Sequence, residues 1–168
     1  MGKSAVKSPG EAPPGTAYGD DLFTWVQEQV VLLLAGRLDE IDAQNIAEEL
    51  ADVGKSERRA LETAIVVLSQ HLLKWDHQPA RRSRSWQLTI VEQRAEIINI
   101  LEDSPGLRSL IGIAIERGYF KGRAQALRET KLADDAMPEV CPYGFDQMMT
   151  REIKLVSNEP ARRRQAKP

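Results

Sequence analysis

The sequence predicts an all-α protein, a single-domain bundle of about five helices between disordered termini. Apolar residues recur at spacings of three and four along most of the chain, which is the period of one face of a helix. Glycines, prolines and capping residues interrupt this period at intervals of helical length. No segment shows the alternation of apolar and polar residues that is typical of a half-buried strand.

Composition divides the chain into three parts. Residues 1–17 are rich in Pro, Gly, Ser and Lys and predict a disordered leader. Residues 18–150 carry the helical period and are expected to form the bundle domain, and residues 151–168 end in ARRRQAKP and predict a basic tail. The formal charge of the 168 residues is only −2, so a surface coated with basic charge for nucleic acid is not expected.

The first three helices are expected before Pro79. The first covers residues 20–35, where an aspartate can cap the start and Gly36 can supply a left-handed stop. The second covers residues 39–53 and is expected to end before Gly54. The third begins with Ser56 as its cap and ends before Pro79, which lacks a backbone donor.

Two further helices are expected after this proline. The fourth begins near Ser83, and the fifth begins at Pro105 and continues to about Glu129, with a possible kink. Small residues recur at every fourth position of the fifth helix: Ala114, Gly118, Gly122 and Ala126. Such a stripe allows another helix to come close. It predicts a tight crossing inside the bundle or, as the alternative, the seam of a homodimer.

Motifs of known chemistry are missing from the sequence. There is no glycine-rich phosphate loop, no GxSxG, no HExxH and no CxxC, so no cofactor is expected. The one cysteine, Cys141, excludes an intramolecular disulfide and is expected to be an idle or buried thiol. The longest apolar run, residues 30–35, has six residues, against about 20 for a membrane span. We therefore expect a cytoplasmic protein with no membrane segment and no targeting peptide.

The two histidines give the chain one possible metal site. His71 and His77 are six residues apart, so on one helix they point in directions about 120° apart and do not share a metal. His71 could instead join Glu48 or Glu49 of the second helix in a histidine–carboxylate site. The preferred interpretation is that His71 packs beside the helical seam with one ring nitrogen hydrogen-bonded.

The most distinctive cluster surrounds the turn between the third and fourth helices. We call it the Arg/Trp turn, and its members are Lys74, Trp75, Arg81, Arg82, Arg84 and Trp86. Arginine with aromatic rings suits a phosphate backbone and unstacked bases. The stretch of residues 38–53, which includes the second predicted helix, carries six carboxylates and no Lys or Arg. If that helix packs beside the turn, the arginines are paired within the fold; otherwise they are available to a partner.

Several blocks of sequence resemble one known family. These are the stretch from DLFTWVQEQVV to SERRALE, then HLLKW, QPARRSRSW, IVEQRAEI, LEDSPGLR and MPEVCPYGFDQMM. Their order is similar to that of the bacterial "domain of unknown function" family numbered twenty-nine, over about residues 18–149. The resemblance implies an all-helical single domain. It implies no activity, cofactor or catalytic residue.

Two classes of function remain open from the sequence. The preferred one is a non-enzymatic module that binds a protein or a nucleic acid through the Arg/Trp turn, since catalytic motifs are missing. The alternative is a metal-dependent, hydrolase-like enzyme that uses His71 with Glu48 or Glu49. The metal-dependent enzyme predicts that the purified protein carries metal. The interaction module predicts that removal of the arginines weakens binding to its partner.

Overall fold

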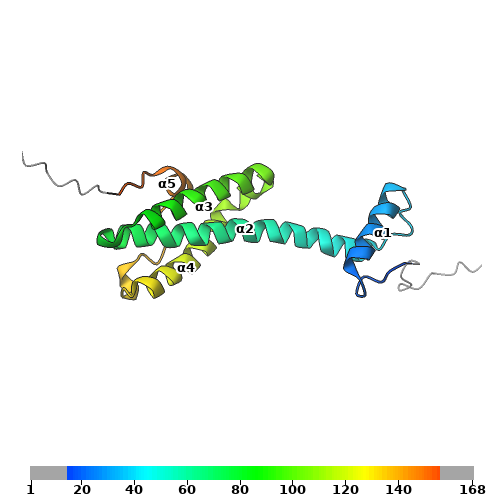
Figure 1. The fold of residues 1–168 in the computed structure, drawn as a ribbon, viewed down its shortest axis with the longest axis horizontal. Coiled ribbons are helices and arrows are strands. Elements are labelled where there is room, and N and C mark those ends of the chain that lie inside the picture. The colour runs from blue at the N-terminus through cyan, green and yellow to red at the C-terminus, as the bar shows by residue number, and fades with distance from the viewer. Residues whose placement is uncertain (1–14, 156–168) are drawn as a thin grey trace, which may run out of the picture. The chain divides into compact units, whose positions relative to one another are not determined.

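The computed structural model describes residues 15–155 and confirms the all-α prediction. Its α-helices are α1 (Leu22–Leu34), α2 (Ala43–His77), α3 (Arg84–Asp103), α4 (Ile111–Thr130) and α5 (Phe145–Thr150) (Figure 1). Short 3₁₀ helices lie at Pro79–Arg81, Pro105–Leu110 and Asp134–Ala136. Most of the predicted leader, residues 1–17, and most of the predicted tail, residues 151–168, lie outside the described residues.

The chain forms two compact units, which divide within α2. Unit 1 runs to Lys55 and holds α1 and the start of α2; unit 2 begins at Ser56 and holds the rest of α2 with α3, α4 and α5. The predicted bundle core lies in unit 2.

The two ends of α1 follow the predicted capping chemistry. The Asp21 side chain accepts a hydrogen bond from the backbone N–H of Thr24 at 3.1 Å, which satisfies one of the free donors at the start of the helix. Gly36 adopts a φ of +70°, the left-handed conformation that ends many helices. Asp21 and Gly36 therefore fix the bounds of α1 as expected.

The predicted break at Gly54 is wrong, because the second and third predicted helices are one helix, α2. Gly54 is helical and has no positive φ, and Ser56 lies inside the helix rather than at a cap. A glycine inside a helix costs about 1 kcal/mol relative to alanine, which the good helix formers on both sides offset. The start of α2 is instead capped by Asp42, whose side chain accepts the N–H of Asn45 at 3.2 Å.

Replacing Gly54 by alanine should stabilise α2 by about 0.5–1 kcal/mol, because the position is helical and no atom lies within 4 Å of an added Cβ. Urea unfolding followed by circular dichroism measures the change. If Gly54 ended a helix in a left-handed conformation, Gly54→Ala would destabilise the protein by about 1 kcal/mol instead.

The core of unit 2 forms where α2 packs against α3 and α4. Figure 1 shows the second part of α2 between these two helices. Fully buried side chains from α2 and α3 meet there, among them Leu61, Leu68, Leu72, Ile90 and Ile97. Pro79 follows the end of α2, and α3 begins next to Ser83, both as predicted. The Ser83 side chain caps α3 by accepting the N–H of Trp86 at 3.3 Å.

The small-residue stripe of α4 lies in the crossing with α2. A Cβ added at Gly122 would be 2.6 Å from the carbonyl oxygen of Val66, and one at Gly118 would be 2.6 Å from the Ile65 side chain. Ala114 and Ala126 are also buried. The structure therefore favours the tight crossing over the homodimer seam, since the stripe is covered within the chain. The predicted fifth helix starts later than expected, because residues 105–110 form a 3₁₀ helix before α4.

The described part of unit 2 continues past α5. The Arg151 guanidinium donates to both carboxylate oxygens of Asp76, at 2.7 and 3.0 Å, and the Tyr143 hydroxyl donates to the same carboxylate at 2.6 Å. Ile153 is buried against the core. The packing contacts of unit 2 thus extend to Ile153.

Candidate functional site

Lys74 of the Arg/Trp turn is a buried structural residue. Its Nζ donates to a carboxylate oxygen of Glu129 at 2.6 Å and lies 4.6 Å from the centre of the Trp86 ring. Gln70 donates to the other oxygen of the same carboxylate at 2.6 Å. The hydrogen bond from Lys74 lowers the pKa of Glu129. This pairing joins α2 to α4, so the Lys74 charge is already used within the fold.

Trp75 and Arg82 also contact each other, through a hydrogen bond and a cation–π contact. Trp75 is buried in the core of unit 2. The Arg82 Nε donates to the carbonyl oxygen of Trp75 at 2.9 Å, and its guanidinium carbon lies 5.2 Å from the centre of the Trp75 ring. Trp86 is half-buried against the same core. A base cannot stack on these rings without moving the residues that cover them.

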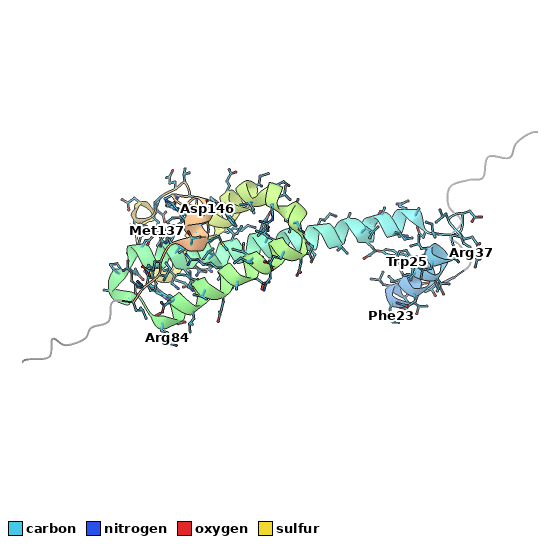
Figure 2. The ribbon with its side chains drawn as sticks, turned by 90° about the horizontal axis from the view of Figure 1, so that it is seen from above. Phe23, Trp25, Arg37, Arg84, Met137 and Asp146 are labelled. Carbon is cyan, nitrogen blue, oxygen red and sulfur yellow. The ribbon has the colours of Figure 1, made fainter. Side chains whose placement is uncertain are left out.

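Arg81 and Arg84 are the exposed remainder of the Arg/Trp turn. Arg84 is the first residue of α3 and lies at the edge of unit 2 (Figure 2). The neighbouring Arg94 is occupied, since it donates to the carbonyl oxygens of Met148 at 2.7 Å and Arg151 at 2.9 Å. Only two of the six predicted binding residues are therefore fully available to a ligand.

The predicted pairing of these cations with carboxylates of residues 38–53 is not what the structure has. Lys74 is paired with Glu129 of α4, and Arg82 with a backbone carbonyl of α2. Residues 43–53 are the first part of α2 and lie in unit 1, whereas the Arg/Trp turn lies in unit 2. Ion pairs and hydrogen bonds of that acidic stretch include local ones, Arg37 with Glu40 and Lys55 with Asp52.

Removing Lys74 should therefore affect stability, and removing the exposed arginines should not. We expect Lys74→Ala to lower the free energy of unfolding by about 1–2 kcal/mol, through lost contact with Trp86 and Glu129. The double variant Arg81→Ala/Arg84→Ala should change it by less than about 0.5 kcal/mol. Urea unfolding followed by tryptophan fluorescence measures both. Equal losses would show that the exposed arginines are also structural.

The predicted metal residues lie in different units. His71 is in unit 2, where its Nδ1 is 2.9 Å from the carbonyl oxygen of Val67 and burial lowers the pKa of its ring. Glu48 and Glu49 are in unit 1, where Glu49 accepts a hydrogen bond from the Tyr18 hydroxyl at 2.6 Å. Within residues 15–155, no group of three or more His, Cys, Asp or Glu side chains is arranged to hold a metal ion.

A groove beside α4 contains the cysteine. Its lining includes Tyr119, Phe120, Val140, Cys141 and Tyr143. Burial raises the pKa of the Cys141 thiol, so the neutral thiol, a weak nucleophile, prevails at neutral pH. The Tyr119 hydroxyl donates to the carbonyl oxygen of Pro138 at 2.6 Å and is thereby committed to holding the loop that forms one side of the groove.

The feature that sequence reasoning missed is the uncovered apolar side of α1. Nine of the thirteen residues of α1 are large and apolar, yet Trp25 is the one among them that is buried. Six of them share one side of the helix, which we call the α1 face: Leu22, Phe23, Val26, Val30, Leu33 and Leu34. At 3.6 residues per turn these six fall within an arc of roughly 120°. An arc of that width is typical of a helix side that faces a core.

A different side of α1 is fixed to the start of α2. The Tyr18 and Trp25 rings meet edge to face, with centroids 4.9 Å apart. The buried Gln29 accepts the backbone N–H of Asp42 at 2.7 Å. Figure 2 shows Trp25 between α1 and the start of α2, whereas Phe23 points away from the start of α2. The α1 face therefore lies on the side that unit 1 leaves open.

The charge of unit 1 is strongly negative. Residues 15–55 carry nine carboxylates and two cationic side chains, a formal charge of −7, whereas residues 56–155 carry fourteen carboxylates and fifteen cations. Between residues 22 and 36 there is no Lys or Arg at all. An apolar helix side in an acidic surround is thus the chemical character of unit 1.

The fold and these surfaces define an all-helical protein. The chain belongs to the family described as "Domain of unknown function DUF29", whose sequence model matches residues 17–153. This match confirms the resemblance seen in the sequence. No curated protein and no solved structure matches the chain. Among the described helices, none is both long enough and apolar enough to cross a membrane.

Proposed function

We propose that the protein is an interaction module, rather than an enzyme, and that it binds a partner protein through the α1 face. The observation that carries the proposal is the exposure of this face: Phe23 is 75% exposed and Leu34 85%. Side chains of this size favour burial by about 1.5–3 kcal/mol each. An apolar face of this width that unit 1 does not cover is typical of a protein–protein contact.

The small core of unit 1 supports the same conclusion. Unit 1 buries one large apolar residue, Trp25, in the described residues 15–55. The same stretch holds nine of the sixteen large apolar side chains that are exposed in residues 15–155. A unit of this size needs a larger core, a crosslink or a partner to be stable. A partner that covers the α1 face would supply the missing core.

Nucleic acid is the weaker alternative for this module. The α1 face is uncharged and unit 1 has a formal charge of −7, which repels phosphate. In the Arg/Trp turn, Lys74 and Trp75 are buried and Arg82 is bonded to a carbonyl. Arg81 and Arg84 remain as exposed cations, and two cations give a much weaker electrostatic contact than the roughly six to ten phosphate contacts of a typical site.

A photo-crosslinker placed at Phe23 tests the proposal in the cells that naturally make the protein. Phe120, on α4 of unit 2, is the matched control, because it is 74% exposed against 75% for Phe23. Each phenylalanine is replaced by p-benzoylphenylalanine in the full-length chain, and adducts are separated by mass after irradiation. We expect one discrete protein adduct from position 23 that is lost when Val30→Gln and Leu34→Gln are added.

Two results would overturn the proposal. One is the absence of any adduct from position 23 at native expression levels. The other is the same adduct from positions 23 and 120, which would mark unspecific contact of any exposed aromatic ring. Thermal unfolding of both substituted proteins checks that each is folded.

A further inference from the structure

We infer that the α1 face takes a basic amphipathic helix of a partner protein. This inference rests on the proposed function and names the class of partner. Its basis is the combination of an apolar helix side of limited width with a strongly acidic surround, and each of these narrows the choice of occupant.

The dimensions of the α1 face suit one helix. The face runs along thirteen residues, from Leu22 to Leu34, a length of about 20 Å at 1.5 Å per residue. Its arc of roughly 120° is the width that one packed helix covers. An occupant therefore needs apolar side chains at spacings of three and four over about three to four turns. The open backbone edge that a strand would need is missing, because every described element is helical.

The negative charge of unit 1 favours basic side chains on the flanks of that helix. Asp20 and Asp39 are exposed and stand before and after α1, and the exposed Glu48 lies on the start of α2. The helix α1 itself has no cation that could attract an acidic partner. Lys or Arg beside the apolar stripe of the occupant would be attracted by the formal charge of −7 on unit 1, which adds affinity and speeds association at low salt.

The same charges disfavour a second copy of the chain. Two α1 faces in contact would bring together two units with a formal charge of −7 each. Like charges brought together across an interface repel each other, and this repulsion disfavours association of the wrong partner. A basic occupant instead neutralises part of this charge, so the heterologous contact is the favoured one.

Fluorescence anisotropy with labelled peptides tests the inference on the full-length protein. The probe is a helical peptide of about 18 residues with leucines at spacings of three and four and lysines elsewhere. Its twin has glutamate in place of each lysine, and a scrambled version keeps the composition without the apolar stripe. We expect the basic amphipathic peptide to bind at least about tenfold more tightly than either other peptide at low salt.

Matched variants assign the binding to the proposed residues. Phe23→Gln should lower the affinity for the basic peptide about tenfold or more, whereas Phe120→Gln should leave this affinity unchanged. Neutralising three acids of unit 1 should also lower the affinity for the basic peptide, by about tenfold at low salt. The substitutions are Asp20→Asn, Asp39→Asn and Glu48→Gln. The control neutralises three exposed acids of α3 and should leave affinity unchanged: Glu92→Gln, Glu96→Gln and Glu102→Gln.

The remaining outcomes separate the two proposals. The basic peptide and its acidic twin could bind equally well, with both losing affinity in Phe23→Gln. That result would overturn the preference for a basic partner and would still support the α1 face as an apolar docking site. Equal binding of the scrambled peptide, or equal loss with both sets of acid variants, would mean charge attraction alone and overturn both. A dimer by light scattering that Phe23→Gln dissociates, with no peptide bound, would assign the face to a second copy and overturn the inference.

Discussion

Replacing Leu72 by alanine should lower the free energy of unfolding of unit 2 by about 3 kcal/mol. Leu72 has no exposed surface and lies in the main core cluster, with Trp75 and Ile97 among its members. Alanine would remove three side-chain carbon atoms and leave a cavity that the helices on both sides cannot fully close. Urea unfolding followed by tryptophan fluorescence measures the loss.

The matched control for Leu72 is Leu34, the last residue of α1. It is 85% exposed, so Leu34→Ala should change the free energy of unfolding by less than about 0.5 kcal/mol. The two leucines would then separate a residue held for stability from one available for binding. If Leu34→Ala cost as much as Leu72→Ala, the α1 face would be covered within the free chain and the docking proposal would fail.

Replacing Gly122 by alanine should destabilise the crossing of α2 and α4 by about 2–3 kcal/mol. The added Cβ would lie 2.6 Å from the Val66 carbonyl oxygen and 3.0 Å from the Gln70 backbone nitrogen. Backbone atoms cannot turn away as a flexible side chain can, so the helices must separate. This cost exceeds the gain of about 1 kcal/mol that alanine brings to a helix.

Gly112→Ala is the control for this substitution. Gly112 lies in the same helix, and no atom is within 4 Å of a Cβ added there. We expect no loss, and a gain of up to about 1 kcal/mol, in urea unfolding. A tolerated Gly122→Ala would mean that α2 and α4 do not cross closely at this residue.

Local chemistry is what the sequence could predict. The cap at Asp21, the left-handed Gly36, the start of α3 next to Ser83 and the end of α2 before Pro79 depend on residues within one turn of the boundary, so they were predictable. Gly54 was mispredicted because a glycine can end a helix or merely weaken one. The neighbouring turns decide between these outcomes, and the residue alone does not.

The candidate site was less predictable, because it depends on long-range contacts. The partner of Lys74 is Glu129, 55 residues further along the chain, and no helical period reveals that pairing. The α1 face did leave a signal, since nine of the thirteen residues of α1 are large and apolar, which is more than the side packed on α2 requires. That signal predicts a helix side that packs against another element, but the sequence alone does not distinguish a neighbour in the core from a partner protein.

Both proposals depend on one property of unit 1, which is that it lacks a sufficient core until a partner covers the α1 face. Hydrogen exchange of the full-length protein at low concentration, with and without the basic amphipathic peptide, tests this property most directly. We predict that amides of α1 exchange faster than those of Leu68–Leu73 in the free chain, because a thirteen-residue helix with little burial is marginal. We also predict that the peptide slows them. Amides of α1 that are as protected as Leu68–Leu73 in the free chain, and unchanged by the peptide, would contradict both proposals.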